Sequence, residues 1–176
     1  MGIRDIVLYP DERLKTVCDP VEQFDQALAD LAVDLEDTRL VGPGAVGIAA
    51  PQIGVLQRVC VVDCSKTRKP TPNNGNLVLV NPEITEWEGL VTGREGCLSI
   101  PDYTGNVIRA ESIRVKAFDV EGREFEIDSE GFEARAIQHE IDHLDGILFL
   151  DRLVSRRKDL FRRKVYQKGG KKKTGS

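Results

Sequence analysis

The sequence has little that would direct it into a membrane or out of the cell. No apolar run in its 176 residues approaches the roughly 18 that a membrane-spanning helix needs. The first residues lack the basic region and apolar stretch of a secretory signal. We therefore expect a cytoplasmic protein whose four cysteines, Cys18, Cys60, Cys64 and Cys97, are reduced thiols rather than disulfides.

Histidine is also scarce, and the chain has only His139 and His143. Both fall in a predicted helix that begins near Glu130 or Gly131 and ends near Leu144. Residues four apart share a helix face, so the two imidazoles can bind one metal ion. Glu140 lies between them, where a general base would be needed. The alternative, two surface histidines placed by chance, leaves that glutamate unexplained.

A catalytic site of this kind needs a third protein ligand and one open position. There is no third histidine, and no glutamate follows Glu140, which argues against a zinc protease whose third ligand lies downstream. Cys97 offers a thiolate, a soft ligand for transition metals, in a glycine-containing segment expected between strands. The alternative for Cys97 is a free core cysteine. Because the helix supplies two ligands where three are needed, we favour Cys97 as the third metal ligand.

Apolar periodicity predicts an α+β fold, with small, mostly antiparallel sheets packed around the helix that carries the histidines, plus a C-terminal helix. Helices are expected near 24–39, 131–144 and 155–167, and strands near 57–63, 77–81, 83–89, 107–109, 112–119 and 123–128. The stretch 40–54 is rich in glycine and proline and is expected to be irregular. Cys60 and Cys64 lie in a valine-rich strand and are expected in the core, with metal binding as the minor alternative.

Charge is unevenly distributed along the chain. Residues 154–176 have a net charge of +9, whereas the remainder has −13 within a total of −4. We expect one catalytic domain over 1–154, followed by a basic helix and disordered tail over 155–176. A basic segment on an acidic body predicts a polyanionic partner, and the alternative is a solvated, charged chain end.

Three segments resemble, in order and spacing, the motifs of the peptide deformylase family. Residues 45–52 resemble its GxGxAAxQ loop, 95–99 match its EGCLS segment, and 139–143 match its HExxH helix. The likeness spans nearly the whole chain. Ala45 departs from the pattern, since the family has its first glycine there. If that position needs a positive φ, alanine costs on the order of 1 kcal/mol, and the fit of substrate at this rim is what the departure affects.

The resemblance implies hydrolysis of the N-formyl group from the initiator methionine of new polypeptides, with release of formate. It implies one divalent metal ion on Cys97, His139 and His143, with Fe²⁺ in the native enzyme and Zn²⁺, Ni²⁺ or Co²⁺ accepted by related sites. Glu140 would be the general acid/base. By analogy with the family, the Gln52 side chain and the Leu98 backbone N–H would stabilise the oxyanion.

The resemblance also implies a substrate site that binds N-formylmethionyl nascent peptides. The backbone of Gly47 and Ile48 is expected to hold the peptide in an extended conformation. Candidates for the methionine pocket are Ile48, Ile100, Phe132, Arg135 and Ala136. Arg109 has two interpretations, a group that positions the substrate or braces the site, and a surface ion pair.

Two other functions remain open at this stage. A metallopeptidase would use the same helix to cleave internal peptide bonds. An RNA-binding module with a structural metal would need a fourth protein ligand. For a deformylase, the basic segment would dock on ribosomal RNA through phosphate contacts; neither a membrane nor sequence-specific DNA is an expected partner.

Overall fold

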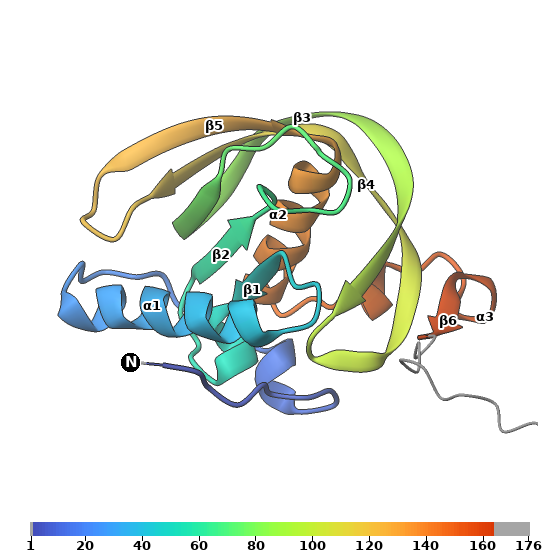
Figure 1. Ribbon diagram of the computed structural model, residues 1–176, viewed down its shortest axis with the longest axis horizontal. Coiled ribbons are helices and arrows are strands. Elements are labelled where there is room, and N and C mark those ends of the chain that lie inside the picture. The colour runs from blue at the N-terminus through green and yellow to red at the C-terminus, as the bar shows by residue number, and fades with distance from the viewer. Residues whose placement is uncertain (1, 164–176) are drawn as a thin grey trace, which may run out of the picture.

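The computed structural model describes residues 2–163 and shows an antiparallel sheet curved around a central helix (Figure 1). Within that range the sheet has six strands in the order β1-β2-β3-β4-β5, with β6 paired to β4. The strands are β1 (Gly47–Ala49), β2 (Val59–Asp63), β3 (Asn76–Cys97), β4 (Ile100–Phe118), β5 (Glu124–Glu130) and β6 (Leu160–Arg162). The predicted α+β class is confirmed, with the strands joined in one continuous sheet.

Three α-helices lie among these strands: α1 (Gln26–Val41), α2 (Gly131–Leu144) and α3 (Arg156–Asp159). Short 3-10 helices occupy Glu12–Lys15, Ala50–Ile53 and Phe149–Arg152. Asp25 begins α1 because its side chain accepts a hydrogen bond from the otherwise unpaired Leu28 backbone N–H. None of the helices within 2–163 is long and apolar enough to cross a membrane.

Strands β3 and β4 form one long ribbon that reaches from the core to the predicted site (Figure 1). Our expectation of separate shorter strands is wrong here, because β3 and β4 continue through the expected breaks at residues 82 and 110–111. Irregularities in register lie between Val80 and Glu83 and between Ile84 and Glu86. At the far end, Leu98 and Ser99 make the turn, and Cys97 pairs with Ile100. Cys97 is therefore the last residue of a strand rather than part of a loop.

The core lies mainly between the sheet and α2. The predicted apolar stripe of α2 is buried there: Ala134, Ile137, Ile141 and Leu144. Cys60 and Cys64 belong to the same cluster, with exposed fractions of 0% and 1%, so their core assignment is confirmed. A second cluster packs Leu28, Leu31 and Leu35 of α1 against Val59 and Val61 of β2. All four cysteines are free thiols.

Helix α2 is attached to the ribbon by a polar contact as well as by its apolar stripe. The Gln138 side chain accepts from the Ala110 backbone N–H at 2.9 Å and donates to the Ala110 carbonyl at 3.0 Å. This pairing extends the hydrogen bonding of β4 onto the helix. It fixes the histidine-bearing face of α2 relative to the end of β3.

The predicted helix over 155–167 is present over Arg156–Asp159 and wrong over Leu160–Arg162. Residues Leu160–Arg162 form β6 instead, which pairs with β4 around Thr104. Gly105 makes this pairing possible, because a Cβ there would lie 2.7 Å from the Leu153 side chain and 3.2 Å from the Asp159 carbonyl oxygen. The Arg94 guanidinium covers the Phe161 ring at 3.7 Å from its centroid. The end of the predicted helix, 164–167, and the predicted disordered tail, 168–176, lie outside the described residues.

The stretch 40–54, expected to be irregular, contains β1 and the 3-10 helix Ala50–Ile53. Ile48 pairs with Val61 of β2, so this stretch forms an edge of the sheet. The glycine and proline content of this stretch suggested only a loop. Its small residues instead allow it to pack closely beside β2.

Candidate metal centre

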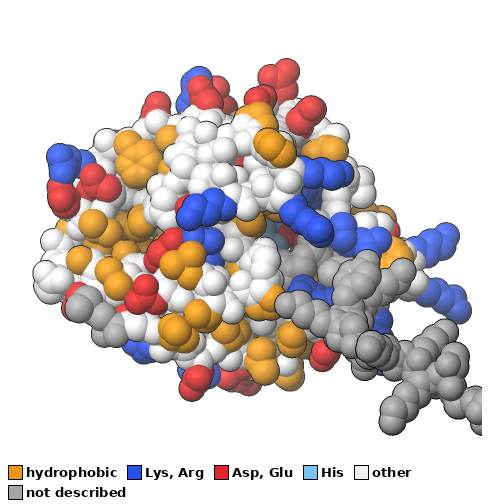
Figure 2. Space-filling model, viewed as in Figure 1, with side chains coloured by type: hydrophobic (Ala, Val, Ile, Leu, Met, Phe, Trp, Pro, Cys, Tyr) orange, Lys and Arg blue, Asp and Glu red, His pale blue; other side chains and the backbone are white. Residues whose placement is uncertain are grey.

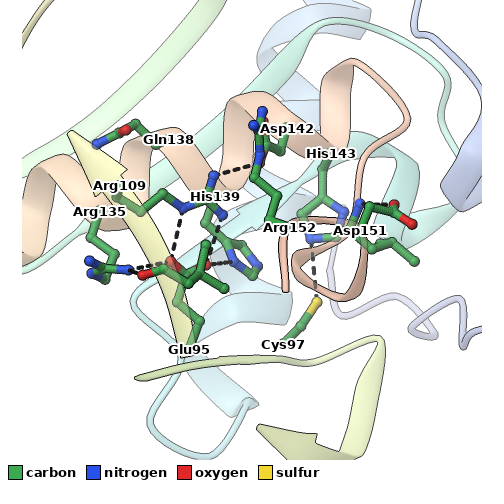
Figure 3. Close-up of polar contacts among 12 residues, drawn as sticks. Glu95, Cys97, Arg109, Arg135, Gln138, His139, Asp142, His143, Asp151 and Arg152 are labelled. Atoms are coloured by element: carbon green, nitrogen blue, oxygen red, sulfur yellow. Dashed lines mark hydrogen bonds and ion pairs between the residues drawn. The ribbon is translucent and has the colours of Figure 1, made fainter. Parts of the chain in front are cut away.

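Cys97, His139 and His143 meet at the junction of β3 and α2, as predicted (Figure 3). One ligand atom from each lies within 4.8 Å of the others, and all three residues are buried. The Cys97 Sγ is 3.3 Å from His143 Nε2. Among residues 2–163 this is the one group of at least three such side chains close enough to share an ion, and it contains three ligands. A three-ligand set leaves a position open, as catalytic sites do.

The chemistry of these donors fits a divalent transition metal. A thiolate and two imidazoles are the ligands that zinc and iron accept. His139 and His143 lie edge to face, with ring centroids 5.0 Å apart, so neither ring blocks the other's approach to a shared ion. His143 Nδ1 is buried and has no hydrogen-bond partner among the described residues. Burial of the ring lowers the pKa of His143 well below its usual value. The ring is therefore neutral and can bind a metal ion.

His139 is held from behind by a buried carboxylate that the sequence analysis did not single out. Glu95 Oε1 lies 2.8 Å from His139 Nδ1, which leaves Nε2 to face the cysteine (Figure 3). Arg109 donates to both Glu95 oxygens, at 2.9 and 2.8 Å, and Arg135 donates to Oε2 at 2.7 Å. Burial raises the pKa of Glu95, but the hydrogen bonds from Arg109 and His139 outweigh it, and the pKa lies well below its usual range. Glu95 therefore stays ionised and fixes the orientation of the ring.

The ion network continues to the other side of α2. Arg109 Nη1 also donates to Asp142 Oδ2 at 2.5 Å, and Arg152 donates to both Asp142 oxygens at 2.7 and 2.8 Å (Figure 3). Arg109 is 4% exposed. It braces the site from inside the protein, and the surface ion-pair interpretation is wrong.

Glu140 lies beside the ligands with one oxygen unpaired. Its Oε2 is buried and has no hydrogen-bond partner within residues 2–163. Burial raises the pKa of Glu140 to about 7. Its Oε1 lies against Gly47, where an added Cβ would be 2.7 Å from that oxygen. Gly47, the glycine of the 45–52 segment, thus makes room for the carboxylate. A carboxyl group with a pKa of about 7 is suited to exchange protons near neutral pH.

Gln52 is 1% exposed, which excludes a surface role. Its Oε1 accepts from the Ala49 backbone N–H at 3.0 Å, so the amide orientation is set. Its Nε2 lies 3.5 Å from Cys97 Sγ and 3.2 Å from Ser99 Oγ. The donor end of Gln52 therefore points into the site. Leu98, in the adjacent turn, packs against Gly42, with its Cδ2 3.0 Å from the position of a Cβ there.

A cleft of 280 Å³ opens at the ligands. Of the predicted site residues, the cleft is lined by Gly47, Gln52, Cys97, Leu98, Phe132, Arg135, Ala136, His139 and Glu140. Ile48 and Ile100 do not line it, because their side chains are buried in two different core clusters. Arg109 does not reach it either, since its guanidinium is held by Glu95 and Asp142. The expected methionine pocket therefore reduces to Phe132, Arg135 and Ala136.

Several residues of the site were missed by sequence reasoning. Glu95 lies inside a recognised motif, and its position two residues before Cys97 on a strand was a usable signal, because both side chains point to the same face. Asp142 and Arg152 carry no local signal, since their role depends on the contact between α2 and the ribbon. Arg94 and Arg163 also line the cleft.

Comparison with known proteins identifies the family. The family model described as polypeptide deformylase matches residues 3–159. A peptide deformylase of Alkalilimnicola ehrlichii is 48% identical over 165 residues, which are 94% of this chain and 90% of that protein. Peptide deformylase 1 of Bacillus subtilis is 46% identical over 87% of this chain and 91% of its own length.

Solved structures show the same similarity. The crystal structure of a peptide deformylase from Legionella pneumophila has a TM-score of 0.79 and 45% identity, over 89% of each chain. That of the peptide deformylase from Thermus thermophilus has a TM-score of 0.77 and 45% identity, over 86% of each chain. Because this agreement covers both the fold and the segments that supply the Cys-His-His site, the chain belongs to the polypeptide deformylase family.

Proposed function

We propose roles for the residues of this site in the reaction of the family, removal of the formyl group from the N-terminal methionine of new polypeptides. The observation that supports them is the buried carboxylate of Glu140, with a free oxygen, beside a three-ligand metal set at the end of a cleft. Cys97, His139 and His143 would hold the metal ion. When bound, the ion supplies a Lewis acid that favours ionisation of water and withdraws charge from the formyl carbonyl.

Glu140 takes the proton of the attacking water and returns it to the leaving amine. Because burial raises its pKa to about 7, the Glu140 carboxylate can both accept and release a proton near neutral pH. The Gln52 amide, held by Ala49, donates to the oxygen on which negative charge develops. The Leu98 backbone N–H, in the turn beside Cys97, is the second donor. Removal of one such donor typically reduces kcat by about 10²–10³-fold.

The substrate peptide binds along β1. This strand pairs with β2 on one edge, and no described strand pairs with its other edge. The backbone N–H and carbonyl of Gly47 lie on the free edge and can hydrogen-bond an extended peptide, as sheet edges commonly do, whereas those of Ile48 point toward β2. The methionine side chain then lies between Phe132 and Ala136 of α2, and the aliphatic part of Arg135 completes the pocket.

The first experiment measures formate release from a formyl-Met-Ala-Ser peptide. Glu140→Gln should keep its metal content and lose about 10²–10⁴-fold in kcat/KM. Asp145→Asn, which changes an exposed carboxylate just beyond the same helix, should leave the rate unchanged. A Glu140→Gln enzyme with full metal and full activity would refute the role of Glu140. Cleavage of an internal bond without formate release would instead support a metallopeptidase.

Fe²⁺ is the native metal in this proposal. A thiolate with two imidazoles accepts Fe²⁺, Zn²⁺, Ni²⁺ and Co²⁺, so the ligand types alone do not select one. The enzyme should be purified without oxygen and reconstituted separately with Fe²⁺ and Zn²⁺. Higher formate release with Fe²⁺ and loss of this activity in air, matched by metal loss or oxidation, would support Fe²⁺. Equal activity with both ions would contradict it.

The basic C-terminal segment is proposed to bind the ribosome in the cytoplasm. Because α3 and β6 pack against β4, a truncation that tests this should begin after Arg163 and remove only 164–176. Cosedimentation with ribosomes should weaken on truncation and with rising salt, because phosphate contacts release counterions. Unchanged, salt-resistant binding of the truncated chain would contradict the proposal. Catalysis of the free peptide serves as the folding control.

A further inference from the structure

Arg163, at the end of the described chain, lies at the mouth of the metal-site cleft. Its guanidinium covers Gly96, the residue before the cysteine ligand, and a Cβ on Gly96 would lie 2.5 Å from Arg163 Nη2. Its backbone N–H donates to the Asp102 carbonyl at 2.8 Å, which continues the pairing of β6 with β4. The side chain is thus positioned by a strand and not by an unattached chain end.

The hydrogen-bonding capacity of Arg163 is unused within the described residues. Its side chain forms no hydrogen bond or ion pair with residues 2–163, and its Nε is screened from solvent without an acceptor. Arg94, on the same cleft, donates to Asn106 and Thr104 and covers Phe161. A guanidinium carries five N–H donors, and screened donors without an acceptor are uncommon in folded proteins. Arg163 therefore differs from the other arginines around the site in having no acceptor among residues 2–163.

The charge around Arg163 favours an anion. The two acids that line the cleft are Glu95 and Glu140. Glu95 is neutralised by Arg109 and Arg135, and Glu140 faces Gly47 deeper in the site. Arg94 and Arg163 then leave a positive mouth, and Figure 2 shows Lys and Arg side chains gathered beside the hollow in which a histidine is visible.

We propose that Arg163 determines specificity by binding a carboxylate side chain of the substrate, an Asp or Glu in one of the positions after formylmethionine. The inference rests on the proposed function, which places the formyl group at the metal ligands and requires the rest of the peptide to leave through the cleft mouth. A carboxylate accepts two parallel hydrogen bonds from a guanidinium, a stronger contact than a backbone carbonyl makes. Substrates with an acidic residue should therefore bind more tightly than neutral ones of the same shape.

The test compares formyl-Met tetrapeptides that carry Glu, Gln or Lys at the second, third or fourth position. For the wild-type enzyme, kcat/KM should be about 3–10-fold higher for Glu than for Gln at one of these positions, mainly through KM, and lowest for Lys. The Glu preference should shrink as salt rises, because exposed charges are screened. Formate release from all peptides establishes the proposed function independently of this preference.

Arg163→Met should abolish the preference for Glu over Gln while formate release from the Gln peptide stays near the wild-type rate. Arg163→Glu should reverse it in favour of Lys. Arg162→Met is the matched control, because it removes the same charge from the exposed neighbouring residue, and it should keep the preference. A wild-type enzyme with no preference, or an Arg163→Met enzyme that retains it, overturns the inference. An equal rate loss for all peptides on Arg163→Met also overturns it, since it would indicate backbone binding. No formate from any peptide would overturn the proposed function as well.

Discussion

Two arginines on β4, five residues apart, form ion pairs with carboxylates in very different surroundings. Arg109 and its partner Glu95 have side-chain exposures of 3% and 5%, and they hold the metal-site end of the ribbon. Arg114 is 41% exposed, and its partners Glu86 and Asp128 are 69% and 75% exposed. The same pairing of residue types therefore acts as a rigid support for His139 at one place and as a solvated surface contact at the other. Burial, and not the pair itself, decides what each contributes.

The largest effect is expected at the buried end. Arg109→Met removes a buried cation that pairs with both Glu95 and Asp142 and leaves each carboxylate with one arginine partner, Arg135 or Arg152. The free energy of unfolding should therefore fall by up to about 3–5 kcal/mol. Urea denaturation of the metal-loaded protein measures this. Arg109→Lys keeps a charge but loses the two-point contact, so its loss should be intermediate. A loss below about 1 kcal/mol for Arg109→Met would show that burial does not distinguish the two pairs.

The next effect concerns the metal. Glu95→Gln removes the charge that orients His139, and metal affinity should fall by about 10–100-fold, as for other residues that hold a metal ligand in place. Competition with a chelator measures the affinity. Glu88→Gln, an exposed glutamate in the middle of the same strand, is the control and should bind metal normally. Unaltered metal affinity in Glu95→Gln would mean that His139 is oriented without this network.

A pair of glycines on β3 sharpens the comparison. A Cβ on Gly93 would lie 2.8 Å from both Cζ and Nε of Arg135, whose guanidinium is bonded to Glu95 and to the Val91 and Val107 carbonyls. Gly93→Ala should cost about 1–3 kcal/mol by disturbing these bonds. Gly89→Ala, at φ +72, should cost about 1 kcal/mol through backbone strain, with an added contact to the Glu111 side chain, whose Oε2 would lie 2.9 Å from the new Cβ.

Thermal or urea unfolding of single and double variants separates the two causes. When Arg135→Met is added, the cost of Gly93→Ala should largely disappear, because the clashing group is gone. The cost of Gly89→Ala should be unaffected by Arg135→Met. Additive losses for Gly93→Ala and Arg135→Met would contradict the steric explanation.

The smallest effect is expected at the exposed pair. Arg114→Met should change the free energy of unfolding by about 0–1 kcal/mol, and metal affinity and formate release should remain at wild-type levels. A loss comparable with that of Arg109→Met would refute the argument from burial. Parallel unfolding curves in low and high salt add a second readout, because any contribution of Arg114 should vanish as salt rises.

Much of the site could be predicted because its strongest signals are local. Residues four apart on a helix must share a face, so His139 and His143 converge whatever surrounds them. Cys97 was identified because the helix lacked a third ligand. The helix 131–144 was also predictable from its apolar stripe, which depends only on helical periodicity. The helix predicted over 155–167 failed because the pairing of Leu160–Arg162 with β4 overrides local helix preference.

The sequence by itself therefore determined the family and the α+β class, and it predicted the metal ligands and the general base, since each depends on spacing within one element or on a linear motif. Only the tertiary structure decided which charges support the site. Arg109 meets Glu95 although the register of β3 with β4 places it opposite Val91, and it meets Asp142 only because α2 packs against that ribbon. Such contacts join residues far apart in the chain, and their strength depends on burial. Neither property is present in a local pattern of residues, which is why two Arg–carboxylate pairs on one ribbon look alike until the chain is folded.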